Sequence, residues 1–306
     1  MKIIGLIAFA TSIAFSALLS TTVNAESSGL DVTVFSAKEA NVNAFIFTDL
    51  KGTVIVDTTR NSKEAHELAA LARSKGIEPN VIFITHGHPD HYLGMGALKT
   101  EFPQAKFIVA TQKVKDDIIN FTKFMESANW LENEPAMKIK SQTNPDGFDY
   151  ENEITVLETK DLVLPAGEHL LIKSDFPSTE APNETLLFSK ELNSVFVSDL
   201  AYNKVHIWLG VGVDKVAINH WKNELNLLKK EYSRNQVKVY PGHGPVSDTT
   251  IFEIDHKYID DLLYIVKSSK DQTEAMSAMI NKYPDWQNTD FILAKSIEFQ
   301  FQQLKE

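Results

Sequence analysis

The sequence predicts an α/β fold made of two similar halves, and three observations lead to that prediction. Short runs rich in Val, Ile, Phe and Thr alternate with segments of helical periodicity. The order of strands followed by a helix occurs twice along the chain. No repeat, low-complexity segment or long linker divides it. We therefore expect residues 26–306 to form a single domain.

The composition is that of an ordinary globular protein. The 306 residues are 43% hydrophobic and 23% charged, which excludes the disordered, collagenous and coiled-coil classes. The absence of cysteine excludes a thiol nucleophile, disulfides, Fe–S clusters and Cys-ligated zinc. The net charge of −11 argues against a nucleic-acid partner, because affinity for phosphates comes mainly from clustered Lys and Arg. The chemistry must therefore come from histidines, carboxylates and hydroxyls.

Residues 1–25 have the pattern of a secretory signal peptide. Lys2 precedes an apolar run that begins at Ile3, and small residues lead to Ala25. The alternative is a permanent membrane anchor, because the run has about the minimum length for spanning ~30 Å of hydrocarbon. We expect cleavage after Ala25, which predicts a periplasmic or secreted protein with no stable membrane span.

The first half of the mature chain combines a strand meander with a βαβ unit. Asn61 and Ser62 begin a predicted helix that stops at Gly76. The predicted strands are 31–36, 44–48, 53–56, 81–85 and 106–110.

Residues 111–152 differ from both halves. They begin with a long helical stretch containing Phe121 and Phe124, and continue through Trp130 into an irregular polar run. One interpretation is a surface insertion with its own small core, and the other is a lid or wall over a site, with the aromatic side chains lining an apolar pocket. We favour the second.

The second half repeats the order of the first. The predicted strands are 154–157, 169–174, 185–188 and 194–197, followed by a helix over 215–230 and a strand over 237–240. Residues 250–306 are expected to be a helical tail, because apolar residues recur there at steps of three and four.

The strongest chemical signal follows the predicted strand 81–85, in the sequence His86-Gly87-His88-Pro89-Asp90-His91. Three histidines and one aspartate fall within six residues of a chain that has 9 histidines in total. A helix is expected to begin near Pro89, so that the extended and the helical part of the loop present their side chains from two directions. Imidazole and carboxylate ligands suit zinc, iron or manganese. This loop is therefore predicted to supply two adjacent metal ions.

This motif resembles the signature of the metallo-β-lactamase superfamily, His-x-His-x-Asp-His after a strand. The resemblance extends over roughly residues 30–250 and includes the order of the motifs. It implies an αβ/βα four-layer sandwich with the metal site along the edge shared by the two halves, here followed by a helical C-terminal extension. It also implies two divalent metal ions, with zinc expected first and manganese or iron as alternatives.

Two further ligands follow from the resemblance. Asp199 ends an apolar strand and matches the metal-bridging aspartate. His243, in the sequence Pro241-Gly242-His243-Gly244, matches the last histidine ligand. Without the resemblance, an aspartate at the end of a strand would be interpreted as a turn or helix cap.

One histidine of the superfamily pattern is absent. Superfamily members carry a histidine about twenty residues before the bridging aspartate, and here Glu180 occupies that place, with Pro182 and Thr185 in register. We predict Glu180 as a ligand of the first metal. The nearest other histidine, His169, is expected at the surface. The competing outcome is a half-empty site that holds one metal.

A glutamate in this position changes the charge of the metal centre. Its extra negative charge makes the centre less positive, so the bound water should have a higher pKa. The harder oxygen ligand also shifts the preference from zinc toward manganese or iron. The sequence therefore predicts an alkaline shift of the pH optimum relative to an all-histidine site.

The resemblance implies a metal-dependent hydrolase that uses a metal-bound hydroxide to cleave a small-molecule ester, lactone or β-lactam. Asp90 is expected to be a ligand and also the catalytic proton acceptor. Tyr202 and His206 are candidate hydrogen-bond donors to the substrate at the mouth of the site, or rim residues with a packing role. The alternative is a catalytically weak or inactive metal- or ligand-binding protein on the same fold. No oligomeric state is predicted.

Overall fold

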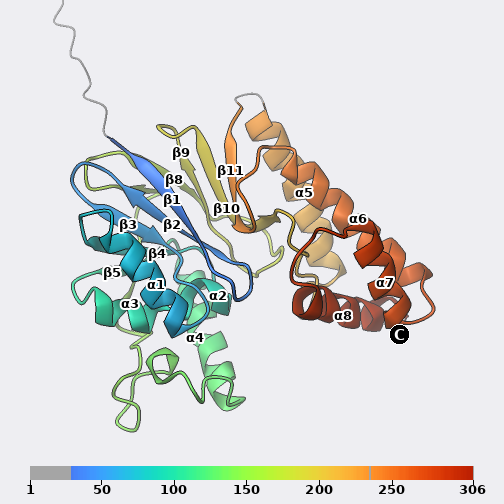
Figure 1. Cartoon of the computed structure of the whole chain (residues 1–306), viewed down its shortest axis with the longest axis horizontal. Coiled ribbons are helices and arrows are strands. Elements are labelled where there is room, and N and C mark those ends of the chain that lie inside the picture. Colours follow the sequence, from blue (N-terminus) through green and yellow to red (C-terminus); the bar gives the residue numbers. More distant parts are fainter. Residues whose placement is uncertain (1–28, 234–235, 306) are drawn as a thin grey trace, which may run out of the picture.

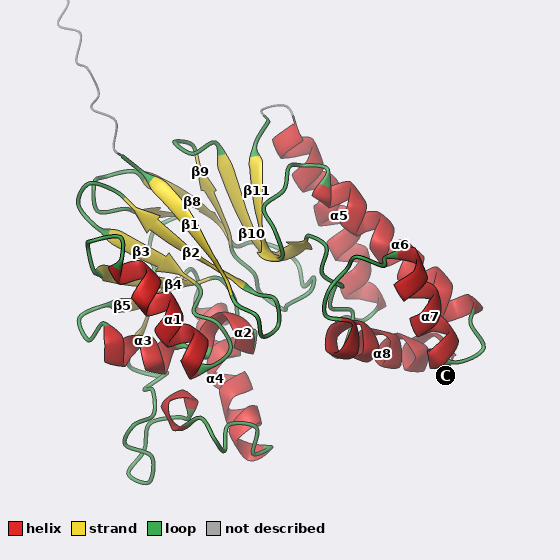
Figure 2. Ribbon diagram, viewed as in Figure 1, coloured by secondary structure: helices red, strands yellow, loops and turns green. Residues whose placement is uncertain are grey.

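Two β-sheets pack face to face and helices cover both outer faces, as Figures 1 and 2 show. The computed structural model describes residues 29–233 and 236–305. The predicted signal peptide, residues 1–25, lies outside the described residues. Within those residues, no helix has the length and apolar character needed to cross a membrane.

The first sheet has six strands in sequence order. They are β1 (Asp31–Ser36), β2 (Asn43–Thr48), β3 (Thr53–Val56), β4 (Pro79–Ile84), β5 (Lys106–Val109) and β6 (Ile154–Val156). The pairs β1–β2 and β2–β3 are antiparallel, and the pairs from β3 to β6 are parallel. The predicted meander followed by a βαβ unit is confirmed, with strand ends shifted by one or two residues.

Helices cover the outer face of this sheet. They are α1 (Ser62–Arg73), α2 (Pro89–Tyr92), α3 (Met95–Glu101), α4 (Gln112–Ser127) and the 3-10 turn η1 (Pro135–Met137). The Asn61 side chain caps α1 by accepting from the Glu64 N–H. Val114 and Ile118 of α4 lie in the core under the sheet, and so do Met137 and Tyr150 from the irregular stretch after it. Residues 111–152 therefore belong to the helical layer through their apolar side chains.

The second sheet has the order β11-β10-β9-β8-β7. Its strands are β7 (Asp161–Val163), β8 (His169–Lys173), β9 (Leu186–Ser189), β10 (Ser194–Tyr202) and β11 (Lys238–His243). The short strand β7 was not predicted. β10 is longer than predicted, so Asp199 lies within the strand, and a break in the β10–β11 register follows Phe196. Ser198, at this irregularity, has a positive φ of 50°.

Helix α5 (Lys215–Tyr232) and the C-terminal segment cover the second sheet. The segment contains α6 (Ile251–Ser268), α7 (Gln272–Lys282), the π-helical turn η3 (Thr289–Leu293) and α8 (Ala294–Lys305). Trp221 of α5 and Tyr258, Ile259 and Leu262 of α6 are fully buried in one core with Val197 of β10. The C-terminal extension is thus part of the second helical layer.

The core between the two sheets is rich in aromatic residues. Phe45 and Phe47 of the first sheet meet Phe196 of the second at ring-centroid distances of 5.1 and 4.7 Å. Tyr240 of β11 stacks on Phe196 at 4.5 Å. The order helix, sheet, sheet, helix confirms the predicted four-layer sandwich. It also brings the ends of β4, β10 and β11 together at one edge.

Candidate metal centre

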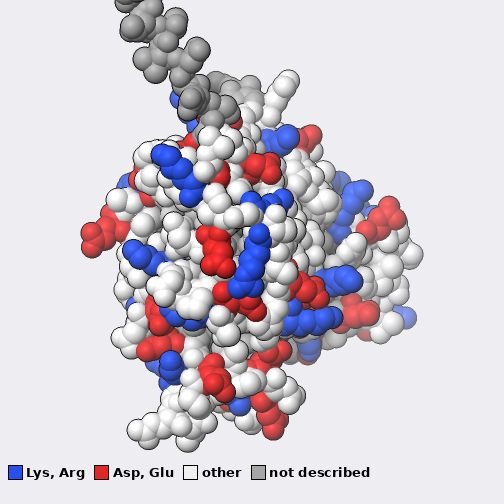
Figure 3. All heavy atoms as spheres, turned by 60° about the vertical axis from the view of Figure 1, so that its left-hand side comes forward, with Lys and Arg blue, Asp and Glu red and all other residues white. Residues whose placement is uncertain are grey.

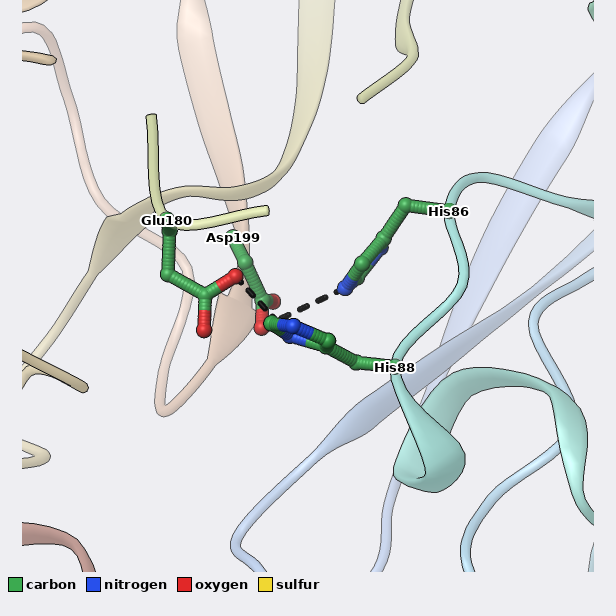
Figure 4. Close-up of side chains that lie close together, drawn as sticks. All are labelled: His86, His88, Glu180 and Asp199. Atoms are coloured by element: carbon green, nitrogen blue, oxygen red, sulfur yellow. Dashed lines mark ion pairs between the residues drawn. The ribbon is translucent and has the colours of Figure 1, made fainter. Parts of the chain in front are cut away.

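The residues of the predicted metal site form two adjacent groups at this edge. In the first group, one ligand atom from each of His86, His88, Glu180 and Asp199 lies within 4.8 Å of the others. The second group contains Asp90, His91 and His243 under the same limit. Figure 4 shows the first group, with the two histidines approaching from the β4–α2 loop and the two carboxylates from the opposite side.

The β4–α2 loop divides its four ligands between the groups. His88 is extended, with φ −84° and ψ 143°, and Pro89 then starts helix α2. The turn of α2 directs Asp90 and His91 into the second group. Gly87 lies against α4, where an added Cβ would be 2.6 Å from Cβ of Asp117. A side chain larger than hydrogen at position 87 would therefore push the loop away from α4.

Hydroxyl groups fix the orientation of His86. Its Nδ1 lies 3.0 Å from both Thr85 Oγ1 and Ser198 Oγ. Its Nε2 is buried, has no hydrogen-bond partner among the described residues, and lies 3.7 Å from Asp199 Oδ2. The ring thus presents one free nitrogen to the first group.

His91 is oriented by a carboxylate that the sequence did not single out. Its Nδ1 lies 2.8 Å from Oδ2 of Asp57, which follows β3 and is 1% exposed. Its Nε2 lies 3.1 Å from Asp199 Oδ1, in a geometry that makes no hydrogen bond. The one sequence signal for Asp57 was its place directly after a buried strand. That signal does not indicate which residue the carboxylate contacts.

His243 completes the second group from β11. Its Nδ1 donates to the carbonyl of Ala40 at 2.9 Å, which leaves Nε2 to face the centre. That nitrogen lies 3.2 Å from Asp199 Oδ2 and 3.6 Å from Asp90 Oδ2. The ring of Tyr202 stacks on the imidazole at 4.5 Å.

Asp199 lies between the two groups. Its carboxylate oxygens face His86 of the first group and His91 and His243 of the second. Gly242 makes room for it, because a Cβ at that position would lie 2.0 Å from Asp199 Oδ1. This position suits a ligand shared by two ions.

Glu180 takes part in the first group, as its sequence position predicts. Its Oε2 lies 2.9 Å from Nδ1 of His88, and the residue is 4% exposed. His169, the nearest other histidine, has an exposed side chain and pairs with Asp161 away from the two groups. Glu180 thus fills the place for which the superfamily pattern has a histidine.

Tyr202 and His206 do not lie where they were expected. Tyr202 is buried behind the ligands, and its hydroxyl lies 3.0 Å from Asp199 Oδ2 and 3.3 Å from Glu180 Oε1. His206 is fully buried, bonds to the Tyr258 hydroxyl at 2.8 Å and packs near Trp286. The placement of His206 at the mouth of the site is therefore wrong, because the chain after β10 turns into the core beneath the C-terminal helices.

Comparison with known proteins agrees with this geometry. A family model described as the metallo-beta-lactamase superfamily matches residues 37–116, which include the whole β4–α2 loop. The chain is similar to this superfamily over that segment. No curated protein matches it.

Solved structures extend the likeness in fold to most of the chain. A metallo-beta-lactamase family protein from Thermus thermophilus is 17% identical over 88% of this chain and 92% of its own, with a TM-score of 0.61. Metallo-beta-lactamases from Pontibacter korlensis and Hirschia baltica are each 15% identical. They cover 76% and 75% of this chain and 94% and 92% of their own, with TM-scores of 0.51 and 0.50. At these identities the likeness shows the fold.

Helix α4 packs against the two loops that carry ligands of the first group. Asp117 packs against Gly87 and accepts a hydrogen bond of 2.8 Å from Asn183, three residues after Glu180. Phe124 and Trp130, farther along, are 50% and 59% exposed and meet edge to face at 5.3 Å. Phe121 stacks on Phe124.

Opposite charges are concentrated in the buried centre. Burial disfavours charge on every group there, yet His91 and His243 hold the pKa of Asp199 well below its usual range. Burial likewise opposes protonation of His88, but Glu180 raises its pKa to about 9. Burial, followed by the charge of His91, lowers the pKa of His86 well below its usual value. Protons on histidines thus balance the carboxylates of the metal-free site, and bound cations would replace them.

The residues present fit a pair of divalent metal ions. The donors are imidazole nitrogens and carboxylate oxygens, the set preferred by zinc and neighbouring transition metals. Among the described residues, Nε2 of His86 and Nε2 of His91 are buried without a hydrogen-bond partner. Such atoms carry a free-energy cost unless they bind something, and a metal ion in each group would remove it.

Proposed function

We propose that this protein is a hydrolase of the metallo-β-lactamase superfamily that holds two divalent metal ions and cleaves a small ester, lactone or β-lactam. The observation that carries the proposal is the position of Asp199 between two complete ligand groups. Two metals in such a site supply a hydroxide nucleophile near neutral pH and polarise the bond to be cleaved. Zinc is the first candidate, with manganese or iron as alternatives.

Asp90 is the proposed proton acceptor. Its side chain is 14% exposed, whereas those of Asp199 and Glu180 are each 2% exposed. It therefore has the best access to solvent and substrate among the three carboxylates. An oxygen of Asp90 that faces away from His243 can take the proton of an attacking water and pass it to the leaving group.

Glu180 is proposed to reduce the positive charge of the centre. Because its carboxylate replaces a neutral imidazole, the bound water should ionise at higher pH than in an all-histidine site. The substitution Glu180→His should shift the rising limb of the pH profile to lower pH and increase the preference for zinc. A variant with an unchanged pH profile and unchanged metal content would contradict this role.

The substrate class is supported by several features. The absence of cysteine excludes sites with a cysteine ligand to the second metal. Lys, Arg, Asp and Glu side chains are interspersed on the face that Figure 3 shows, which offers no argument for a polyanionic substrate. The signal-peptide pattern supports a periplasmic or secreted enzyme, where a small extracellular molecule is the natural substrate. Two bacterial proteins of similar fold are named metallo-beta-lactamases, which supports β-lactams as candidate substrates.

Metal analysis and a hydrolysis panel test the proposal together. The purified protein, loaded separately with zinc, manganese and iron, is assayed with lactones, thioesters, aryl esters, phosphodiesters and β-lactams. We expect two ions per chain and turnover of at least one carboxylic ester, lactone or β-lactam. Asp90→Asn should retain the fold and lose turnover by about 10²–10⁴-fold. Absence of bound metal under metal-replete conditions would favour the alternative, a binding protein on this fold.

A further inference from the structure

A second buried glutamate lies four residues after Glu180. Glu184 is 1% exposed, and its Oε1 accepts a hydrogen bond of 2.8 Å from the Thr179 hydroxyl. The same oxygen accepts a bond of 3.2 Å from the backbone N–H of Ala181. The mechanism proposed above assigns no role to this carboxyl group.

The two donors to Glu184 are the neighbours of Glu180 on either side. The segment from 174 to 185 is irregular, so no helix or sheet ladder holds it in place. A glutamate side chain on such a loop samples many rotamers unless its backbone is fixed. The carboxyl of Glu184 holds the side chain of Thr179 and the backbone of Ala181. Together with the backbone hydrogen bond from Thr179 N–H to the Ala181 carbonyl, these bonds close a turn around Glu180, whose side chain is directed toward the centre.

The carboxylate of Glu180 makes two contacts that depend on the position of its loop. Its two oxygens lie 2.9 Å from His88 Nδ1 and 3.3 Å from the Tyr202 hydroxyl. These contacts come from different layers of the fold, and a small shift of the loop would lose both. Glu184 does not join the ligand group by the distances that define it. Its contribution is therefore to position, not to bind.

We propose that Glu184 is the positioning residue of the first metal site, and that it acts by holding the loop that carries Glu180. This inference rests on the proposed metal centre. According to this inference, binding of the first ion depends on two hydrogen bonds, and neither of them involves an atom that binds the metal. The second ion, held by Asp90, His91 and His243, does not depend on them.

Four substitutions test the inference through metal affinity. Glu184→Ala removes both hydrogen bonds, and Glu184→Gln keeps a carbonyl oxygen to accept them. Thr179→Val removes one bonded hydroxyl at almost constant shape. Thr185→Val is the matched control, because the Thr185 hydroxyl is buried in the same loop and makes no hydrogen bond among the described residues. Zinc binding to the metal-free proteins is measured by chelator competition, and metal content by elemental analysis.

We expect Glu184→Ala to weaken one of the two ions by about 10–100-fold, the range typical for residues that orient a ligand. Thr179→Val should weaken the same ion by less, while Glu184→Gln and Thr185→Val should retain wild-type affinity. The other ion should be unchanged throughout, which also reports that the variants are folded. If Glu184→Ala cannot be purified folded, Thr179→Val against Thr185→Val decides the question.

Two results would overturn the inference. One is wild-type affinity for both ions in Glu184→Ala and Thr179→Val. The other is an equal loss in Glu184→Gln and Glu184→Ala, since it would show that the negative charge matters and the hydrogen bonds do not. Glu180→Gln separates this inference from the proposed function. If that variant also binds both ions normally, the assignment of Glu180 as a ligand fails first.

Discussion

Oδ2 of Asp57 lies 2.8 Å from Nδ1 of His91, while the opposite nitrogen of the ring faces Asp199. The other oxygen of Asp57 accepts from the backbone N–H of Thr85 at 2.9 Å. One carboxylate therefore holds the start of the metal-binding loop and also one of its ligands. A carboxylate on Nδ1 keeps the proton there, so that Nε2 is free to bind a metal.

Asp57→Asn should weaken binding of the second ion by about 10–100-fold. The asparagine tolerates the positive φ of 63° at this position and can still accept from Thr85. Because the amide oxygen stays on the Thr85 N–H, the amide nitrogen faces His91. Nδ1 of His91 then becomes an acceptor and the proton moves to Nε2, which cannot bind a metal in that form. Calorimetric zinc titration checks this. Asp49 also has a buried carboxylate, which caps a turn, so Asp49→Asn is the control and should bind both ions. Normal second-site affinity in Asp57→Asn would refute the tautomer argument.

Tyr202→Phe should retain the fold and Tyr202→Ala should damage it. The phenylalanine keeps the ring that stacks on His243 and loses only the hydroxyl near Asp199 and Glu180, at a cost on the order of 1 kcal/mol in unfolding free energy. The alanine leaves a cavity in a fully buried position, at a cost of about 3–5 kcal/mol. Urea unfolding of the metal-free proteins distinguishes them, and equal midpoints would contradict the packing role.

Gly242→Ala should weaken both ions at once. The new Cβ would lie 2.0 Å from Asp199 Oδ1 and 2.8 Å from the backbone carbon of Ser198, so the shared carboxylate must move. Gly167→Ala is the control, because its φ of 108° strains alanine but no atom lies within 4 Å. The control should lose roughly 1–3 kcal/mol of stability and bind both ions. Elemental analysis after gel filtration checks the metal content, and two retained ions in Gly242→Ala would contradict the shared role of Asp199.

Acid should destabilise the metal-free protein partly through His206. Burial lowers the pKa of this residue to about 4, against about 6.5 in the unfolded chain. Between those two pH values the unfolded chain binds a proton that the folded chain does not. The free energy of unfolding therefore falls as the pH falls through this window, by on the order of 3 kcal/mol for this one group.

His206→Gln removes this titration. The difference in urea-unfolding free energy between about pH 7 and about pH 5 should be smaller in the variant than in the wild type. Ser296→Ala is the control, because it removes a buried hydroxyl under the same C-terminal layer that does not titrate, and it should leave the pH dependence unchanged. An identical pH slope in His206→Gln and the wild type would show that the residue does not titrate in this range.

Local sequence patterns predicted most of the secondary structure, because alternation and helical spacing are properties of neighbouring residues. The strands β1 and β3 match their predicted limits. The short β7, with the sequence Asp-Leu-Val, was missed because it lacks the β-branched run that marks the equally short β6, Ile-Thr-Val. The extension of β10 through Asp199 to Tyr202 was missed because pairing with β11, rather than local composition, continues the strand.

The sequence by itself determined the metal-binding loop, because His86, His88, Asp90 and His91 are close in the chain and their spacing carries the chemistry. Tertiary structure alone decided which groups surround them. Asp57 reaches His91 across 34 positions, and Tyr202 reaches Glu180 across 22. His206 shows the converse, since its closeness to Asp199 in sequence did not bring it to the site. Packing of the two sheets and the C-terminal helices sets these distances, and no local spacing encodes them.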